Sequence, residues 1–569
     1  MVKNIFPLII VVLLAFVAGL PLIHKDLPPT HDGEYHVVRF YEFDKTLRDG
    51  NWYPRFAADL NNGYGVPLFN YVYPLPNYVA SFFHLFGFSF IDSFKLNMFL
   101  AIILGAVFFY LWAKVFWGVW GGLVGSIFYT FSPYHFVDIY IRGSVGEIWA
   151  LAFFPAFLWS ITRFIHEFRT FNITSEESKP LLGYLRGGRF TVFFVMSSVF
   201  LSLIIFSHNI LALMFFFFAV VYMGFLIYQT KNRKYIILNT LYIMLLSLGL
   251  SAIFWLPAIL EKKYVTGLEV FDASYHFPDL YQLLMPSWGS GFSGENVGSQ
   301  MSFQIGIANL FAVFLSLLLF FVYKKKNKSG SIVLFFILLF LLIVFLMLKV
   351  SLPIWQAVPF MNYFQFPWRL LSLEILIASF LSGSIVYFCR SKIVATCLVL
   401  IAFFLGIGYA KPAHYLYRDD SYYISRSNFI DGTNSPGNVF NTVYFDTGID
   451  KEKKKIKFLK GEGKIDQEIV KTTYYKFAIE ASKQSEAQVN TAYFPDWSVF
   501  VDGRKTKIDI TDEGLFSFNL DRGNHEVEVR LVNTTVRNLA DLLFFTSIAL
   551  LVTLFIKALL SRSRYMQNG

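Results

Sequence analysis

Residues 31–39, HDGEYHVVR, place two carboxylates and three basic side chains directly after a long apolar segment. Asp32 and Glu34 are two residues apart, and His36 and Arg39 follow on the same stretch. Carboxylates and imidazoles transfer protons, and arginine binds anions, so these residue types favour a chemical site. The alternative is a helix cap, because a carboxylate near a helix N-terminus accepts hydrogen bonds from free N–H groups. For this stretch taken alone, the helix cap is the favoured interpretation.

Three further stretches carry ionisable side chains at the ends of apolar segments. Each stretch also has a purely structural interpretation. Glu147 would be the N-terminal charge of a membrane helix, and His208 would be a polar residue of a turn. Arg142 and Arg369 would be interfacial anchors. However, a charge at membrane depth costs about 2.5–3.5 kcal/mol, so such groups usually face a cavity or a partner. We therefore expect one polar cavity, walled by aromatic residues, to gather all four stretches. Its further members are Asp138, Arg142, Glu147, His208, Asn209, Gln365 and Arg369.

The composition indicates what kind of protein must position these groups. Of 569 residues, 55% are hydrophobic and only 15% are charged, and long apolar runs recur. The sequence therefore predicts a polytopic α-helical membrane protein. The net charge of +10 suggests nucleic-acid binding only weakly, because the basic residues gather in short loops between apolar runs. About twelve transmembrane helices are expected, over 5–23, 93–113, 116–132, 147–165, 190–207, 210–229, 235–255, 303–323, 331–349, 370–388, 394–410 and 538–560.

The direction of each span follows from the basic loops between them. Alternation from a cytoplasmic N-terminus places the basic loops 230–234, 324–328, 389–392 and 561–564 on the cytoplasmic side of a plasma membrane. Both termini are then cytoplasmic, and the four chemical stretches share the opposite face. Residues 74–90 are ambiguous, and an interfacial or re-entrant helix is expected because a full crossing would invert the later topology.

The block 411–537 differs from the rest of the chain, because polar, strand-like runs alternate there with turn signals such as VDGR and DRGN. We predict an extracytoplasmic β-sandwich or jelly-roll domain in this block. It follows a transmembrane domain over 1–410 and precedes a last helix with a basic tail over 538–569. The two cysteines, Cys389 and Cys397, lie at or within apolar runs, so neither a disulfide framework nor a zinc cluster is expected.

Aromatic and turn residues fill the loop 50–78, which also holds Arg55. Trp and Tyr suit a membrane interface and also stack on sugar rings, and composition does not decide between these uses. Walker, GxSxG and HExxH motifs are absent from the sequence, and no Rossmann GxGxxG motif follows a predicted strand. Nucleotide hydrolysis, hydride transfer and zinc proteolysis therefore have no support.

Several of these stretches resemble a known family. Residues 31–78 are similar to the first outer loop of large bacterial and archaeal GT-C-like membrane proteins, often labelled "6-pyruvoyl-tetrahydropterin synthase-related". PYHFVDIYIRGSVGEIW, SHNILAL, MSFQIG and QFPWRLLSL resemble later signatures of that family. AYFPDWSVFVDG and GLFSFNLDRGNHEVEVRL resemble the outer β-domain of YfhO-type membrane glycosyltransferases. The pterin label itself has no support, because the zinc and cysteine site of that soluble enzyme has no counterpart in this sequence.

The resemblance implies a membrane glycosyltransferase that takes a sugar from a polyprenyl-phosphate or pyrophosphate donor. The acceptor would be a glycan, a lipid or a protein of the cell envelope. By position, Asp32 is the catalytic acidic residue and general base, with Glu34 next, and transfer is expected to invert the anomeric carbon. Arg142 and Arg369 would hold the lipid phosphate, with help from His208. The substrate site would further include His36, Arg39, Arg55, Asp138, Glu147, Asn209 and Gln365. No cofactor is certain, and a divalent Mg²⁺ or Mn²⁺ ion between Asp32, Glu34 and Asp138 or Glu147 is an open alternative.

Two other functions stay open at this point. A transporter or scramblase of lipid-linked saccharides would also need a polar cavity and basic groups, but no catalytic carboxylate. A non-catalytic assembly protein would use its β-domain to bind a glycan or a partner. An anchor alone rarely needs about twelve spans with charged outer loops, so this function ranks last.

Overall fold

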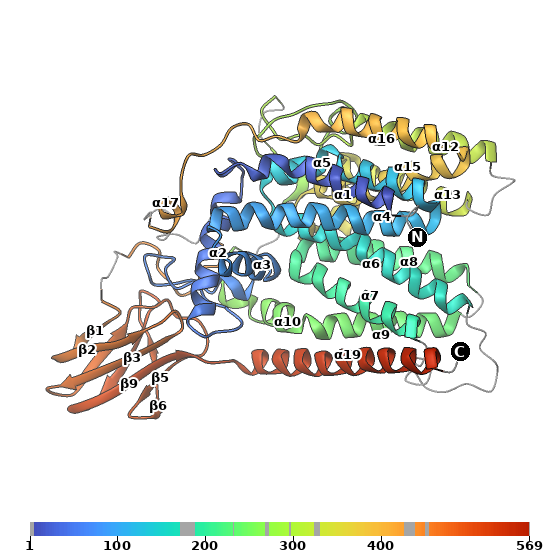
Figure 1. Ribbon diagram of the computed structural model, residues 1–569. Coiled ribbons are helices and arrows are strands. Elements are labelled where there is room, and N and C mark those ends of the chain that lie inside the picture. The colour runs from blue at the N-terminus through green and yellow to red at the C-terminus, as the bar shows by residue number, and fades with distance from the viewer. Residues whose placement is uncertain are drawn as a thin grey trace.

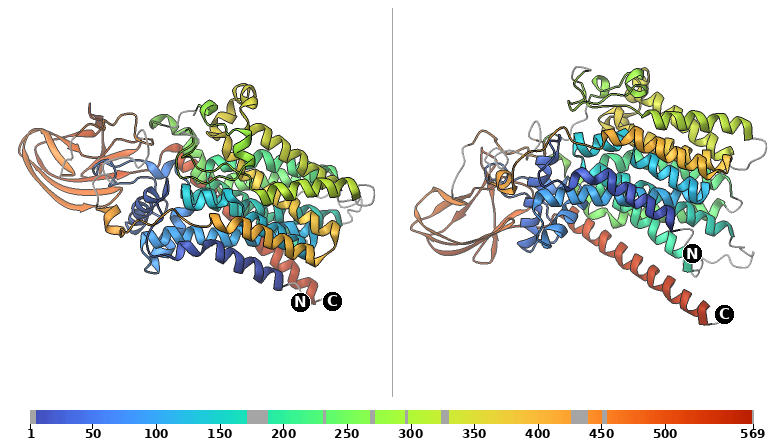
Figure 2. Two further views of the ribbon diagram at one scale, coloured as in Figure 1. Left: turned by 90° about the horizontal axis from the view of Figure 1, so that it is seen from above. Right: turned by 45° about the horizontal axis from the view of Figure 1, so that its top comes forward.

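The computed structural model describes residues 5–170, 188–230, 233–267, 272–294, 298–323, 330–425, 439–449 and 454–567. Long helices run side by side in a bundle, and a group of β-strands stands at one end of it (Figure 1). Helix α1 (Phe6–Gly19) begins, and α19 (Thr535–Gln567) ends, at the end away from the strands (Figures 1 and 2). We call the other end of the bundle, which carries the strands, the strand end.

Ten of the described helices are long and apolar enough to cross a membrane, so the chain is a multi-span membrane protein. One of them, α4 (Phe90–Thr130), has 41 residues, about twice what one crossing needs. Counting its two limbs separately and adding α12 (Ile307–Tyr323), an apolar helix of 17 residues, gives the twelve expected segments. The predicted basic loop 324–328 lies outside the described residues.

Helix α4 is a hairpin that folds back at Gly118, where φ is 73° and ψ is −175°. Ser126 Oγ donates a hydrogen bond of 2.7 Å to the Ala106 carbonyl oxygen of the other limb. The rings of Phe109 and Tyr129 stack across the hairpin with centroids 4.6 Å apart. The sequence predicts the boundary between the two spans a few residues earlier, between residues 113 and 116. The chain turns at Gly118 instead, because a positive φ is open to glycine at little cost.

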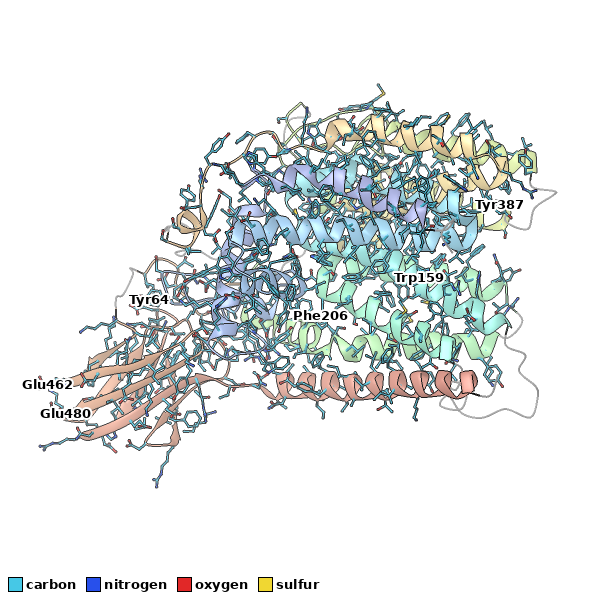
Figure 3. The ribbon with its side chains drawn as sticks, in the orientation of Figure 1. Tyr64, Trp159, Phe206, Tyr387, Glu462 and Glu480 are labelled. Carbon is cyan, nitrogen blue, oxygen red and sulfur yellow. The ribbon has the colours of Figure 1, made fainter. Side chains whose placement is uncertain are left out.

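Two of the spanning helices, α6 (Val145–Thr170) and α15 (Leu371–Cys389), are almost wholly buried and pack against α4. Helices that are apolar on every side belong in the interior of a bundle. Tyr387, near the last turn of α15, lies at the end away from the strands, so α15 begins at the strand end (Figure 3). The other spanning helices are α7 (Gly188–Ser207), α8 (Asn209–Tyr228), α9 (Arg233–Leu250), α13 (Gly330–Met347) and α16 (Lys392–Gly406).

Two shorter helices, α2 (Gly33–Arg48) and α3 (Leu75–Leu85), follow α1 at the strand end (Figure 1). Helix α3 has eleven residues, which is too few to cross a bilayer. Residues 74–90 therefore make no full crossing. Phe82, Leu85 and Phe86 on and after this helix are exposed. This exposure suits the interfacial helix that the sequence predicts.

The strands form two antiparallel sheets, with orders β1-β4-β8-β7 and β2-β3-β9-β5-β6. The sheets share one core, in which Trp497 of the second stacks on Phe516 of the first, 6.0 Å between centroids. The predicted β-structure near the C-terminal end of the chain is thus confirmed, as two packed antiparallel sheets. The strands are β1 (Ile456–Lys460), β2 (Gly463–Val470), β3 (Tyr474–Ala481), β4 (Ser485–Val489), β5 (Trp497–Val501), β6 (Arg504–Thr506), β7 (Asp509–Ile510), β8 (Phe516–Leu520) and β9 (Gly523–Leu531).

Helix α2 buries an acidic side chain, that of Glu42, and this makes stability depend on pH. Burial, together with Asp59, raises the pKa of Glu42 from 4.5 to about 8, although Lys45 opposes the effect. Between these two values the unfolded chain has lost a proton that the folded chain keeps, so rising pH favours unfolding. We expect wild type to lose about 1.4 kcal/mol of unfolding free energy per pH unit relative to Glu42→Gln. Thermal unfolding of both proteins from pH 5 to 8 measures this loss, and parallel curves would contradict it.

Candidate functional site

Four segments that are far apart in the sequence meet at the strand end of the bundle. Main-chain hydrogen bonds of 2.9 Å join the first two, from His31 N to the Ile141 carbonyl oxygen and from Asp32 N to that of Arg142. Side chains of the other two, His208 and Arg369, reach a carboxylate of the second segment. The expectation that separate loop tips build one polar cluster therefore agrees with the geometry.

Glycines in the motif RGSVGE allow these segments to approach so closely. Gly143 has a φ of 66°, and a Cβ there would lie 2.2 Å from Thr30 Oγ1. A Cβ at Gly146 would lie 2.4 Å from the Tyr73 ring and 2.6 Å from the Ser207 carbonyl oxygen. Any larger residue at either position would push the first loop or the α7–α8 link away from the cluster.

Glu147, in the first turn of α6, is the centre of a buried ion-pair network and has no exposed surface. Arg142 donates to it twice, from Nη1 to Oε2 over 2.5 Å and from Nη2 to Oε1 over 2.7 Å. Arg369 Nε donates to Oε1 over 3.1 Å. Arg142 also binds Asp138 at the other end of a π-helical turn, a feature that is frequent at functional sites. Two arginines thus share one carboxylate in a geometry that fixes both guanidinium groups.

Aromatic rings and a strained turn surround the two arginines. The Arg142 guanidinium lies 4.8 Å from the centre of the Trp368 ring. Gln365 has φ 65° and ψ −60°, and Phe366 N donates to the Phe364 carbonyl oxygen over 2.8 Å, which makes a γ-turn of the rare, strained kind. The Gln365 side-chain oxygen accepts a hydrogen bond from Arg369. The turn therefore holds the Arg369 side chain in place from the side opposite Glu147.

Two histidines border the network as neutral rings. His208 Nε2 lies 3.8 Å from Glu147 Oε1, and its ring centroid is 5.0 Å from that of Tyr73. Burial lowers the pKa of His208 to about 3, with Arg369 and Arg142 adding to the effect against Glu147. Burial also lowers the pKa of His36 well below its ordinary value, and Arg39 and His208 contribute. Both imidazoles are therefore uncharged at neutral pH, and His208 Nδ1 accepts a hydrogen bond from Leu211 N over 3.3 Å.

Asp32 occupies the N-cap position of α2, but its side chain does not cap the helix. Thr30 Oγ1 accepts the hydrogen bond from Gly33 N instead, over 3.1 Å. Within the described residues no hydrogen bond reaches the Asp32 carboxylate, which is half-buried and lies in the electrostatic field of Arg39 and Arg369. The structural interpretation of Asp32 as a helix cap is therefore wrong, and its carboxylate is available to a ligand.

Three predicted site residues lie elsewhere. Glu34 points away from the cluster and pairs with Arg418 Nη1 at 2.7 Å. Arg55 donates to Asn70 Oδ1 over 2.9 Å and to the Ile253 carbonyl oxygen, in a separate buried group. Asn209 is exposed at the start of α8. Each stretch holds several polar residues, and the local chain direction decides which of them faces the cluster.

The predicted metal ligands are not brought together. Asp138 is fully buried against Arg142, and Glu34 is held by Arg418, so neither shares a site with Asp32. In the part of the chain that the structure describes, no group of three His, Cys, Asp or Glu residues is arranged to hold a metal ion. The described geometry therefore does not favour a metal ion between Asp32, Glu34 and Asp138, nor the variant with Glu147, whose oxygens are occupied by the two arginines.

Sequence reasoning missed the neutral members of the cluster. Tyr134 OH donates to Glu147 Oε2 over 3.4 Å, and Tyr73 and Trp368 pack against His208 and Arg142. Tyr73 lies in the aromatic loop 50–78, and Tyr134 and Trp368 lie in the stretches PYHF and QFPWR next to the predicted charged residues. Their positions next to the charged residues were the available signal, but an aromatic belt at a membrane interface has the same composition.

No protein-family model and no curated protein matches this chain. Among solved structures, the cryo-EM structure of arabinofuranosyltransferase AftD from mycobacteria is similar to it, with a TM-score of 0.42 and 13% sequence identity. The match covers 71% of this chain and 27% of the AftD chain, so this chain spans about a quarter of the length of that protein. A likeness this distant says nothing about what this chain acts on.

Proposed function

We propose that this protein transfers a sugar from a polyprenyl-phosphate donor to a cell-envelope acceptor, at the strand end of the bundle. The observation that carries the proposal is the Asp32 carboxylate, which has no hydrogen bond in the described structure and lies beside a fixed cluster of arginines. A protein that serves only as a scaffold or as a membrane anchor does not need a carboxylate without a hydrogen-bond partner at this position. The resemblance of residues 31–78 to the first outer loop of GT-C-like proteins points in the same direction.

The chemistry assigns a role to each charged group. Asp32 takes the proton of the acceptor hydroxyl as its oxygen bonds to the anomeric carbon. The bond from that carbon to the phosphate oxygen breaks, and the lipid phosphate leaves with the electron pair. The transition state has oxocarbenium character, and attack opposite the leaving group inverts the carbon. Arg39 and Arg369 stabilise the leaving phosphate, since arginine binds phosphate oxygens through paired hydrogen bonds. Arg142, which the resemblance assigns to the phosphate, is instead paired with Asp138 and Glu147 and holds the network together.

The charge balance of the cluster supports binding of an anion. Arg39, Arg142 and Arg369 face the carboxylates of Asp32 and Glu147. Burial and the neighbouring Glu147 raise the pKa of Asp138 well above its ordinary value, against the effect of Arg142, and this favours a neutral carboxyl group. Within the described residues, three guanidinium groups thus gather around the carboxylates of Asp32 and Glu147, an arrangement that suits the binding of a phosphate monoester or diester.

The proposed orientation places the strand end outside the cytoplasm. Helix α15 runs from the cluster to the opposite end of the bundle, where Tyr387 lies (Figure 3). The basic residues Arg390 and Lys392 follow directly after it. Basic loops are retained in the cytoplasm, so their position at the far end supports an extracytoplasmic site.

The test uses the full-length protein in proteoliposomes with a panel of labelled polyprenyl-phosphate sugars and a cell-envelope extract as acceptor. We expect release of free polyprenyl phosphate together with labelling of an acceptor. Movement of the lipid-linked sugar between leaflets without a new glycosidic bond would overturn the proposal in favour of a transporter. Neither release nor movement with any donor, by a folded protein, would favour an assembly role.

A further inference from the structure

Tyr73 lies at the strand end of the bundle, two residues before helix α3 (Figure 1). Its ring centroid is 5.0 Å from that of His208. A Cβ atom added at Gly146 would lie 2.4 Å from the Cζ atom of Tyr73, which carries the hydroxyl group. Gly146 directly precedes Glu147, the centre of the ion-pair network. The hydroxyl end of Tyr73 therefore lies beside the arginine cluster of the candidate transfer site.

The Tyr73 hydroxyl lies in the electrostatic field of four charged side chains. Those of Arg39 and Asp32 act on it most strongly, and those of Glu147 and Arg142 act more weakly. In the proposed reaction, Arg39 stabilises the leaving phosphate and Asp32 takes the proton of the acceptor. The hydroxyl is therefore close to the proposed base and to one of the two proposed phosphate ligands.

The Tyr73 hydroxyl differs from its neighbours in having no hydrogen bond within the described residues. The stretch NYVYPLPNY holds two other tyrosines. The Tyr71 hydroxyl donates to the Glu261 carbonyl oxygen over 2.8 Å. The Tyr78 hydroxyl donates to the Trp52 carbonyl oxygen over 2.7 Å. A tyrosine hydroxyl inside a protein usually has such a partner, so the half-buried side chain of Tyr73 is suited to take one from a ligand.

The packing around Tyr73 uses its ring and not its hydroxyl group. The ring lies next to that of His208 and also packs against a small apolar cluster. The members of this cluster are Tyr53, Ile253 and Phe254. A phenylalanine at position 73 would make the same ring contacts. The hydroxyl therefore adds a hydrogen-bond donor that the fold itself does not use.

We propose that the Tyr73 hydroxyl donates a hydrogen bond to the phosphate oxygen that leaves the anomeric carbon, next to Arg39. The electron pair of the breaking bond stays on this oxygen, and the hydrogen bond strengthens as the negative charge develops. Burial raises the pKa of Tyr73 against the effect of Arg39, so the phenol keeps its proton and acts as a donor throughout. Its role in transfer rests on the proposed function, whereas its hydrogen bond to an isoprenoid phosphate does not.

The first experiment measures binding of geranyl phosphate to the full-length protein in nanodiscs by calorimetry at pH 7, with empty nanodiscs as the blank. This ligand carries, on a short isoprenoid, the phosphate monoester that transfer would release. We expect Tyr73→Phe to weaken binding about tenfold, because one hydrogen bond to a charged group is lost. Binding of geraniol, which has no phosphate, should be the same for both proteins.

Tyr71→Phe is the matched control, since it removes a hydroxyl two residues earlier in the same stretch. That hydroxyl is bonded to the Glu261 carbonyl oxygen, which is not part of the transfer site. We expect Tyr71→Phe to bind geranyl phosphate like wild type and to unfold at a lower temperature, because an internal hydrogen bond is lost. Tyr73→Phe should show the opposite, with weaker binding and an unchanged unfolding temperature.

The second experiment measures sugar transfer as a function of pH. With saturating donor and acceptor, we expect Tyr73→Phe to lower kcat about 10–100-fold and to leave the acid limb of the pH profile in place. If the hydroxyl instead served Asp32, it would stabilise the ionised carboxylate. Its removal would then move the acid limb to higher pH, because a bond that favours the ionised form would be lost.

The outcomes distinguish a contact with the phosphate from the alternatives. Equal binding of geranyl phosphate by wild type and Tyr73→Phe, or equal weakening in Tyr71→Phe, would overturn the proposal. A shifted acid limb would overturn it in favour of a positioning role toward Asp32. Absence of binding to folded wild type would also overturn it. Weaker binding by Tyr73→Phe without any sugar transfer by wild type would leave the phosphate contact standing and refute only the proposed function.

Discussion

Asp32→Asn is expected to lower the rate of sugar transfer by about 10²–10⁴-fold, the usual contribution of a positioned general base. Asparagine has the same shape but cannot accept the proton of the acceptor hydroxyl. The carboxylate makes no hydrogen bond in the described structure, so its loss should leave the fold and the unfolding temperature unchanged. Release of polyprenyl phosphate from the active donor, measured at saturating acceptor, gives the rate.

The matched control for this prediction is Glu34→Gln, two residues along the same helix. Glu34 is the acidic residue nearest to Asp32 in the sequence, and its side chain is bound to Arg418 at 2.7 Å. We expect Glu34→Gln to transfer at close to the wild-type rate, since the pair is partly exposed and contributes little. If Glu34→Gln lost activity while Asp32→Asn kept it, the two roles would be reversed and the assignment of Asp32 would fail.

Glu147→Gln is expected to destabilise the folded protein by about 3–5 kcal/mol, the cost of removing one partner from a buried ion pair. The side chain has no exposed surface and neutralises two arginines, one of them through two hydrogen bonds. Glutamine keeps the shape but removes the charge and presents an N–H group to a guanidinium. The midpoint of thermal unfolding, followed by tryptophan fluorescence in detergent, should fall by many degrees, and transfer should fall with it.

The variant Asp138→Asn tests whether the loss of stability is specific to Glu147 or follows from any substitution in this buried region. Asp138 also lies against Arg142 and is fully buried, but the pKa of its carboxyl group is raised by burial and by Glu147. A neutral carboxyl group resembles an amide, so the loss of stability should be clearly smaller than for Glu147→Gln.

Combining Glu147→Gln with Arg369→Gln should restore part of the stability, because one uncompensated charge is then removed. Equal losses in all three variants would contradict the central position of Glu147.

The spanning helices and most strands of the β-domain are predictable from the sequence, because the burial of their side chains produces a recognisable pattern of apolar residues along the chain. Apolar runs of about 20 residues mark the bundle, and alternation marks strands such as β9. Strand β2 (Gly463–Val470) is not predicted in this way, because it is a polar edge strand without a buried residue. Two apolar runs predict the two limbs of the α4 hairpin as separate spans, while its turn at Gly118 depends on close packing that no apolar run reveals.

That charged and aromatic residues gather at the ends of several membrane helices can be read from the sequence, because ionisable groups interrupt apolar runs only where water, a partner or a ligand compensates them. The pairing of these residues cannot: that Glu147 binds two arginines, that Glu34 pairs with Arg418 and Arg55 with Asn70, and that no hydrogen bond reaches the Asp32 carboxylate within the described residues follow from the folded chain. An ion pair depends on distances of a few ångströms between segments far apart in the sequence. Those distances follow from glycines such as Gly143 and Gly146, whose contacts exist only once the helices have packed.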